Sequence, residues 1–212
     1  MTTTTSPPCV AGQPQPAQKP IGLRLATALS EVFAPLVQVL AQSTLVLWHP
    51  WPDANVLGWW LLAVTFGSAV PMLFLIYGMR RGSWLDHHVP QREHRILPMI
   101  AILASLLLGF GALSLAGAPR PICAVFALLA IQLAVLTLIT RWWKISVHTS
   151  VATTTVAVAA LVGGPLLLAA FAPIAPLTVW TRTHMRAHTL GQAVTGVLVG
   201  TAICAVALPL LA

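Results

Sequence analysis

The chain has 212 residues, of which 58% are hydrophobic and only 7% are charged, and its formal net charge is +7. This composition excludes an ordinary soluble domain. The cations border long apolar runs and form no solvated stripe, which argues against nucleic acid as a partner. The three cysteines have no metal-ligand spacing and do not indicate a disulfide framework.

Residues 1–20 are rich in Thr, Pro and Gln, and we expect a disordered tail there. Residues 21–212 are then a single domain. Its first apolar stretch, Ile21–Trp48, is either a membrane span with a polar face turned inward or an interfacial helix, and we favour the span. Its polar side chains are Arg24, Glu31, Gln38 and Gln42.

Further uncharged runs are long enough to cross a bilayer, which takes about 20 residues. A longer run, Thr149–Trp180, has 32 uncharged residues with Gly163-Gly164-Pro165 near its middle, and we expect two short passes from it. The sequence therefore predicts an all-α, polytopic transmembrane bundle of six to seven helices. The other runs are Val56–Gly78, Leu97–Gly117, Pro121–Thr140 and a C-terminal helix from about His188.

Most cations and histidines lie in three basic segments, Arg80–Arg95, Arg141–His148 and Arg182–His188. Two predicted crossings separate each segment from the next, so all three can meet on one side of the membrane. Converging Arg, Lys and His side chains form a pocket for an anion. With only four acidic residues in the chain, the phosphate of a lipid is the simplest ligand.

The third basic segment contains a candidate nucleophile. His188 and Gln192 are four residues apart and share one face of a helix. The amide oxygen of Gln192 can hold one imidazole nitrogen of His188, which leaves the other nitrogen to attack.

The second basic segment contains a candidate anion site at a helix start. Ser146 is a plausible N-cap, and a helix N-terminus offers backbone N–H groups and a partial positive charge. His148 then lies in the first turn, where it can give a proton to a leaving oxygen.

These residues resemble the type 2 phosphatidic acid phosphatase superfamily over roughly residues 56–212. The third family motif is Ser-Arg, five residues, His, three residues, Asp, and here Thr181-Arg182 precedes His188 and Gln192 at that spacing. The second motif, Pro-Ser-Gly-His, corresponds to residues 145–148. The first motif, Lys, six residues, Arg-Pro, places Arg95 at its Arg and His88 at its Lys.

The resemblance implies hydrolysis of a lipid phosphate or prenyl (di)phosphate through a phosphohistidine on His188. His148 protonates the leaving group and then activates water. Arg182 and Arg95, with Ser146 and the N–H of Val147, bind the phosphate oxygens. The family needs no metal and no cofactor. Its members are multi-pass proteins of the cell membrane, so the bilayer and the lipid substrate are the expected partners.

Three departures from the family pattern leave the activity open. Gln192 replaces the Asp that orients the nucleophile, so we expect either slower turnover or a different function for the protein. Val147 replaces Gly and restricts the phosphate loop. The Lys of the first motif is missing, and Lys144 is our candidate for its substitute.

Two other functions stay open. The main one is a non-catalytic lipid-phosphate-binding or transport relative, which the Gln192 and Val147 departures favour. The other is an intramembrane prenyl transferase or cyclase, which needs paired aspartates to hold magnesium. The four acids form no such pair, and the loop histidines have no matched second cluster, so we expect no metal site. The acids are Glu31, Asp53, Asp86 and Glu93, and the loop histidines are His87, His88 and His94.

Orientation and assembly are predicted from single features. The cations collect on the side of the basic segments, which places that side in the cytoplasm. Gly196 and Gly200 form a small-xxx-small pair, and this pair packs either inside the bundle or between the subunits of a homo-oligomer.

Overall fold

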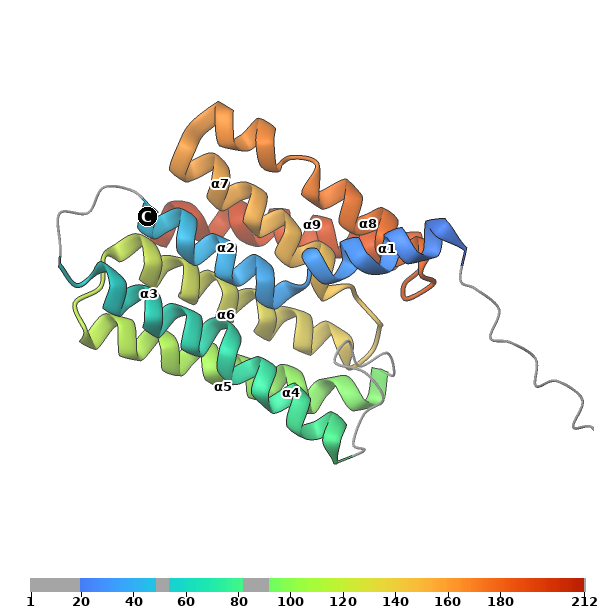
Figure 1. Cartoon of the computed structure of the whole chain (residues 1–212), viewed down its shortest axis with the longest axis horizontal. Coiled ribbons are helices and arrows are strands. Elements are labelled where there is room, and N and C mark those ends of the chain that lie inside the picture. Colours follow the sequence, from blue (N-terminus) through green and yellow to red (C-terminus); the bar gives the residue numbers. More distant parts are fainter. Residues whose placement is uncertain (1–19, 49–53, 82–91, 212) are drawn as a thin grey trace, which may run out of the picture.

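The computed structural model describes residues 20–48, 54–81 and 92–211, and every regular element in these ranges is helical. The helices lie side by side along one long axis (Figure 1). The predicted all-α bundle is therefore confirmed. Its elements are α1 (Ile21–Val32), α2 (Pro35–Trp48), α3 (Val56–Val64), the π-helical turn η1 (Thr65–Ala69), α4 (Val70–Arg80), α5 (Arg92–Leu115), α6 (Arg120–Thr140), α7 (Val147–Phe171), α8 (Ile174–His184) and α9 (Leu190–Leu211).

The described helices have the length and composition of a multi-pass membrane protein. Five stretches are long and apolar enough to cross a bilayer, one of them formed by α3, η1 and α4 together, and there are six if the bent pair α1–α2 is counted as one span. Large apolar side chains also cover the outside of the bundle, such as Leu108 on α5, which is 64% exposed, and Leu166 on α7, which is 79% exposed. These faces suit hydrocarbon and not water.

The first predicted helix is not straight. α1 and α2 meet at an angle of 46° at a break before Pro35. Proline lacks the N–H that continues a helix, and it disfavours helical geometry at the preceding residue, here Ala34. The prediction of one helix over Ile21–Trp48 missed this break. Ser30, shortly before it, is buried, whereas Glu31 is exposed.

The long run after the second basic segment folds back on itself as α7 followed by the shorter α8. Of these two helices α7 alone is long and apolar enough to cross a bilayer, so the two expected passes stay a prediction. α7 changes direction at Gly164, whose φ of 60° is open to glycine. The chain then returns through α8, which packs against α7, α9 and α1. α7 begins at Val147 and α8 ends at His184, so both helices take residues from the basic segments.

The described parts of the three basic segments lie at one end of the bundle (Figure 1). α4, α6 and α8 end there, and α5, α7 and α9 begin there. The backbone N–H of Ser146 donates to the carbonyl of Gln192 at 3.4 Å, which joins the second segment to the start of α9. We call this the basic end of the bundle.

Two glycines bring α9 close to α7. A Cβ at Gly196 would overlap Thr149 Oγ1 and lie 2.6 Å from the Ser146 carbonyl, and a Cβ at Gly200 would lie 2.7 Å from the Ser150 carbonyl. The hydroxyl of Thr149 donates to the Ala193 carbonyl at 2.9 Å across the same contact. The small-xxx-small pair therefore packs within the bundle.

Buried polar side chains fix the rotation of α7. Gln132 on α6 donates to Ser150 at 2.6 Å and accepts from Thr154 at 2.8 Å. Gln42 on α2 donates to Thr155 at 2.8 Å. Polar partners on two sides hold the helix in one orientation, because unpaired polar groups inside a membrane protein are costly.

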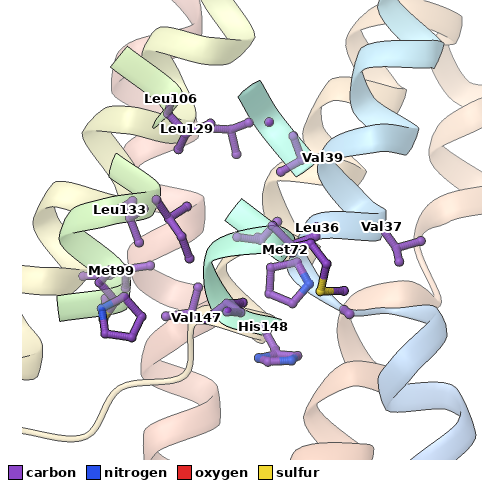
Figure 2. Close-up of a pocket in the computed structure, with 18 of the residues that line it drawn as sticks. Leu36, Val37, Val39, Met72, Met99, Leu106, Leu129, Leu133, Val147 and His148 are labelled. Atoms are coloured by element: carbon purple, nitrogen blue, oxygen red, sulfur yellow. The ribbon is translucent and has the colours of Figure 1, made fainter. Parts of the chain in front are cut away.

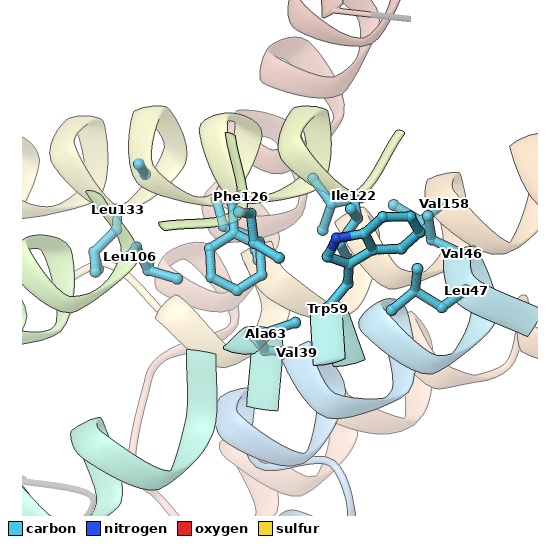
Figure 3. Packing of buried hydrophobic residues seen from close by; sticks show 14 of the residues in the cluster. Val39, Val46, Leu47, Trp59, Ala63, Leu106, Ile122, Phe126, Leu133 and Val158 are labelled. Carbon is cyan, nitrogen blue, oxygen red and sulfur yellow. The ribbon is translucent and has the colours of Figure 1, made fainter. Parts of the chain in front are cut away.

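The main apolar core runs along the bundle and reaches Leu136 and Ile145 near the basic end. Trp59 and Phe126 are its largest members (Figure 3), and the indole N–H of Trp59 donates to the Ala116 carbonyl at 3.0 Å. The π-turn η1 borders this core. Its freed carbonyl at Phe66 accepts the Ser105 hydroxyl at 2.6 Å, so the irregular turn leaves that group satisfied.

Candidate active site

The start of α7 is built as predicted. Ser146 has extended backbone angles (φ −90°, ψ 108°), and its Oγ accepts the Thr149 N–H at 3.4 Å, which makes it the N-cap. Ser146 is fully buried, and its own N–H is bonded to Gln192. These contacts give Ser146 a part in shaping the turn, and its contact with phosphate stays a prediction.

The end of α8 holds His188 beside Arg182. The Arg182 carbonyl accepts the N–H groups of Ala187 at 3.0 Å and of His188 at 3.1 Å. The five residues between Arg182 and His188 therefore form the last turn of α8 and its C-terminal cap. Arg182 is 1% exposed, and its Nη1 donates to Ser30 Oγ on α1 at 2.9 Å. His188 is 5% exposed.

His148 lies in the first turn of α7 and is 7% exposed. The N–H groups of this turn have no acceptor within the helix, because the first four of any α-helix lack one. His148, Arg182 and His188 are thus all buried at the basic end, on three helix termini that backbone hydrogen bonds tie together. Such an arrangement can surround a small anion.

An apolar cavity of about 190 Å³ adjoins His148. Figure 2 shows His148 and Val147 at one side of it and Leu106, Leu129 and Val39 at the opposite side. Its lining comes from α1, α2, η1 and α4 to α7. The polar side chains among the lining residues are Glu31, Gln132 and His148. The cavity thus joins a charged end to a hydrocarbon-like interior.

Gln192 has a local partner that the sequence interpretation overlooked. Its Oε1 accepts the Thr189 N–H at 3.2 Å, and Thr189 Oγ1 accepts the Gln192 N–H at 3.3 Å. This reciprocal pair is the capping box of α9. The oxygen assigned to His188 thus serves the start of the helix, and the orienting role of Gln192 stays a prediction.

The remaining predicted residues are placed less completely. Lys144 is half-buried in the loop between α6 and α7. Arg95 lies on the first turn of α5, and its side chain falls outside the described residues, as does His88. Pro98 and Met99 on the same helix line the cavity, so α5 begins beside the site.

The sequence offered the loop histidines as the candidate ligands of a metal ion. The described ranges contain no group of three or more His, Cys, Asp or Glu side chains placed to hold a metal ion. His87, His88 and His94 lie outside the described side chains.

Sequence reasoning missed Ser30, Glu31 and Thr189. Thr189-x-x-Gln192 carries the capping-box pattern in the sequence itself, so this contact was open to prediction. Pro35 signals the break after α1. The bond between Ser30 and Arg182 has no sequence signal, because these residues are 152 positions apart.

No protein-family model matches the chain, and searches of curated proteins and of solved structures also found no match.

Proposed function

We propose that this protein is a membrane-embedded, metal-independent phosphatase that hydrolyses a lipid phosphate or a prenyl (di)phosphate. The observation that supports the proposal is that Arg182, His188 and His148 are all buried at the basic end of the bundle, where His148 lines an apolar cavity. His148 is distant in sequence from Arg182 and His188, and the spacing of these residues resembles the family motifs. The family resemblance supplies the reaction.

The cavity suits the hydrocarbon part of such a substrate. A cavity of about 150 Å³ lined by Leu, Ile and Phe stays dry and binds benzene, and the cavity here measures about 190 Å³. It therefore holds a short stretch of chain next to the phosphate, and a longer chain continues into the bilayer. The phosphate lies towards His148 at the start of α7.

The proposed reaction has two steps. An imidazole nitrogen of His188 attacks phosphorus, the P–N bond forms, and the P–O bond to the leaving group breaks as His148 protonates the departing oxygen. His148 then takes a proton from water, the water oxygen attacks phosphorus, and the P–N bond breaks. Arg182, Arg95 and the Val147 N–H offset the charge on the phosphoryl oxygens, and one such donor contributes about 3 kcal/mol.

Phosphate release tests the proposal. Purified protein, with EDTA present, is given prenyl diphosphates, undecaprenyl diphosphate and phosphatidic acid. We expect release from at least one of them, loss in His188→Asn, and normal rates in His184→Asn. His184 is an exposed histidine at the basic end that stacks on Trp180 at 5.0 Å. Equal rates for His188→Asn and wild type would contradict the proposal.

A non-catalytic lipid-phosphate-binding or transport protein is the second candidate. The capping box of Gln192 favours it, because that side chain already has a structural use. The bond between Arg182 and Ser30 favours it for the same reason. Binding of a prenyl diphosphate without release of phosphate by wild type would support this function over the first.

We further propose that the basic end faces the cytoplasm and that the membrane is the cell membrane. Removing the three cations assigned to chemistry still leaves five on that side against Arg120 on the other. Cytoplasmic prenyl diphosphates are then natural substrates. Cysteines placed at Gln91 and Ala118 test this: reagent that reaches Gln91→Cys only from outside would reverse the orientation.

A further inference from the structure

An apolar groove of about 340 Å³ lies on the outer face of α2. Phe171, at the end of α7, forms its other wall. The α2 residues that line it follow the i, i+3, i+4, i+7, i+8 pattern of one helix face. The buried Gln38 and Gln42 lie on the opposite face of the same helix. The lining residues of α2 are Val37, Leu40, Ala41, Thr44 and Leu45.

The groove meets the cavity beside His148 at Val37, which lines both of them. Val37 is 44% exposed, and it lies on the other side of α2 from Leu36, which also lines the cavity (Figure 2). The cavity therefore opens to the outside of the bundle beside Val37. From this opening to Leu45 the groove follows α2 for about 12 Å, at 1.5 Å per residue, and it leads away from the basic end (Figure 1).

The groove offers apolar surface to a ligand. Thr44 is the one polar residue among those that line it. The Thr44 hydroxyl donates to the Leu40 carbonyl at 2.9 Å and accepts the indole N–H of Trp60 at 3.1 Å. This hydroxyl is thus already hydrogen-bonded within the protein, and a hydrocarbon chain is the ligand that suits the groove.

We propose that the far part of the substrate's hydrocarbon chain leaves the cavity past Val37 and lies in this groove, between α2 and Phe171. This inference rests on the proposed function, and it narrows the substrate class to long-chain lipid or prenyl phosphates. In the proposed reaction the leaving oxygen carries the chain and departs beside His148, which lines the cavity. The chain therefore starts at the inner end of this path.

The two hollows divide the chain between them. The cavity of about 190 Å³ holds the part next to the phosphate, and the groove of about 340 Å³ holds the part that follows. α2 precedes residues 56–212, which resemble the phosphatase family, so the groove is an addition to that region.

The benefit of the groove is orientation. Membrane lipid is as apolar as the groove, so a chain gains little free energy simply by leaving the lipid. A chain held at a second place fixes the direction of the whole substrate, and the rate of attack on phosphorus depends on such positioning. A short-chain phosphate that ends inside the cavity lacks this second contact and should react more slowly.

Photolabelling locates the chain without any need for hydrolysis. The probes are geranyl phosphonate and geranylgeranyl phosphonate, each with a diazirine at the far end of its chain, because the proposed reaction does not break a P–C bond. The full-length protein in phosphatidylcholine nanodiscs is irradiated with each probe, and the labelled residues are mapped by mass spectrometry. We expect the longer probe to label Phe171 and the groove face of α2, and the shorter probe to label the cavity. Excess geranylgeranyl phosphonate without the diazirine should suppress both.

The control for ordinary membrane lipid is geranylgeraniol with the same diazirine, which has no phosphonate to hold it at the basic end. It should label the groove no more than the outer faces of α5 and α9. Equal labelling of the groove by the alcohol and by the long phosphonate would mean that bulk lipid fills it, and the inference would be overturned. Labelling by the long phosphonate that is absent, confined to the cavity or spread over the outer faces would overturn it too.

A variant blocks the path. Ala41→Phe fills the middle of the groove and leaves the cavity lining unchanged. It should abolish most of the labelling of Phe171 by the long phosphonate, whereas Ala202→Phe, on the exposed outer face of α9, should not. A thermal scan checks that both variants are folded. Normal labelling of Phe171 in folded Ala41→Phe would contradict the path, and the labelling of wild type is a test that needs no variant.

Phosphate release keeps the two proposals apart. If the long phosphonate labels the groove but geranyl and geranylgeranyl phosphates release no phosphate, the phosphatase fails and the chain site stands. If phosphate is released and Ala41→Phe slows both substrates equally, the phosphatase stands and the chain site fails.

Discussion

The contact between α7 and α9 sets the relative position of the helix starts near His148 and His188, and Gly196→Ala tests it directly. A methyl group at this position overlaps Thr149 Oγ1 and the Ser146 carbonyl, which is backbone at the N-cap of α7. The substitution therefore forces apart the two helix starts that carry His148 and His188. The substitution should therefore lower both the stability of the protein and its catalytic rate.

The magnitude follows from opposing terms. Alanine is a better helix former than glycine by about 0.5–1 kcal/mol. Overpacking a tight contact costs about 1–3 kcal/mol, and displacing the Thr149 hydroxyl from the Ala193 carbonyl costs about 1 kcal/mol more. The net loss is about 2 kcal/mol, which lowers Tm by about 4–8 °C in a chain of this size. A shift of about 1 Å between the histidines lowers kcat about 100-fold.

Gly111→Ala is the matched control. Gly111 lies inside α5, and a Cβ there meets no atom within 4 Å. Only the helix-propensity term applies, so Tm should rise by about 2 °C and the rate of phosphate release should stay unchanged. Thermal scans and phosphate release on both variants decide the matter. Similar behaviour of Gly196→Ala and Gly111→Ala would refute the packing that places the site.

Two further predictions concern the capping box and the cavity. Thr189→Ala should lower Tm by about 2–4 °C because the cap is lost, and the folded protein should keep its turnover rate. Gln192→Asp should raise or preserve the turnover rate, because it gives His188 a negatively charged neighbour. Complete loss of activity in Gln192→Asp would count against the orienting role. Leu129→Phe fills the far side of the cavity and so excludes two or three methylene groups of the substrate chain, each contributing about 0.8 kcal/mol. The kcat/KM for a long-chain substrate should fall about 30-fold, while a short-chain phosphate reacts normally. Leu138→Phe, on the exposed outer face of the same helix, is the control, and equal losses in both variants would show that no chain enters the cavity.

Much of the fold was predictable because hydrophobic run length and parity are strong signals in membrane proteins. The run Thr149–Trp180 was too long for one straight helix, and the chain does turn at Gly164 and return through α8, which has 11 residues. The break at Pro35 was within reach of the same rules, because proline restricts its own residue and the one before it.

The details of the site were less predictable because they depend on which distant helix supplies a partner. Ser146 could be predicted as an N-cap since the relevant N–H is three residues away. The bond from Arg182 to Ser30 could not, because it depends on how α1 packs against α8. The left-handed conformation of Arg186 (φ 54°) was hidden for a different reason, because the sequence has Arg where the backbone favours Gly.

The most direct measurement is a search for phosphate bound to His188. His148→Ala is incubated with 4-nitrophenyl phosphate, whose leaving group departs without a proton, and the denatured protein is mapped by mass spectrometry. Since this variant lacks the base that activates water, we predict an acid-labile phosphohistidine at His188 that accumulates, and none in His148→Ala/His188→Asn. Steady release of 4-nitrophenol by His148→Ala with no phosphate on His188 would contradict the account.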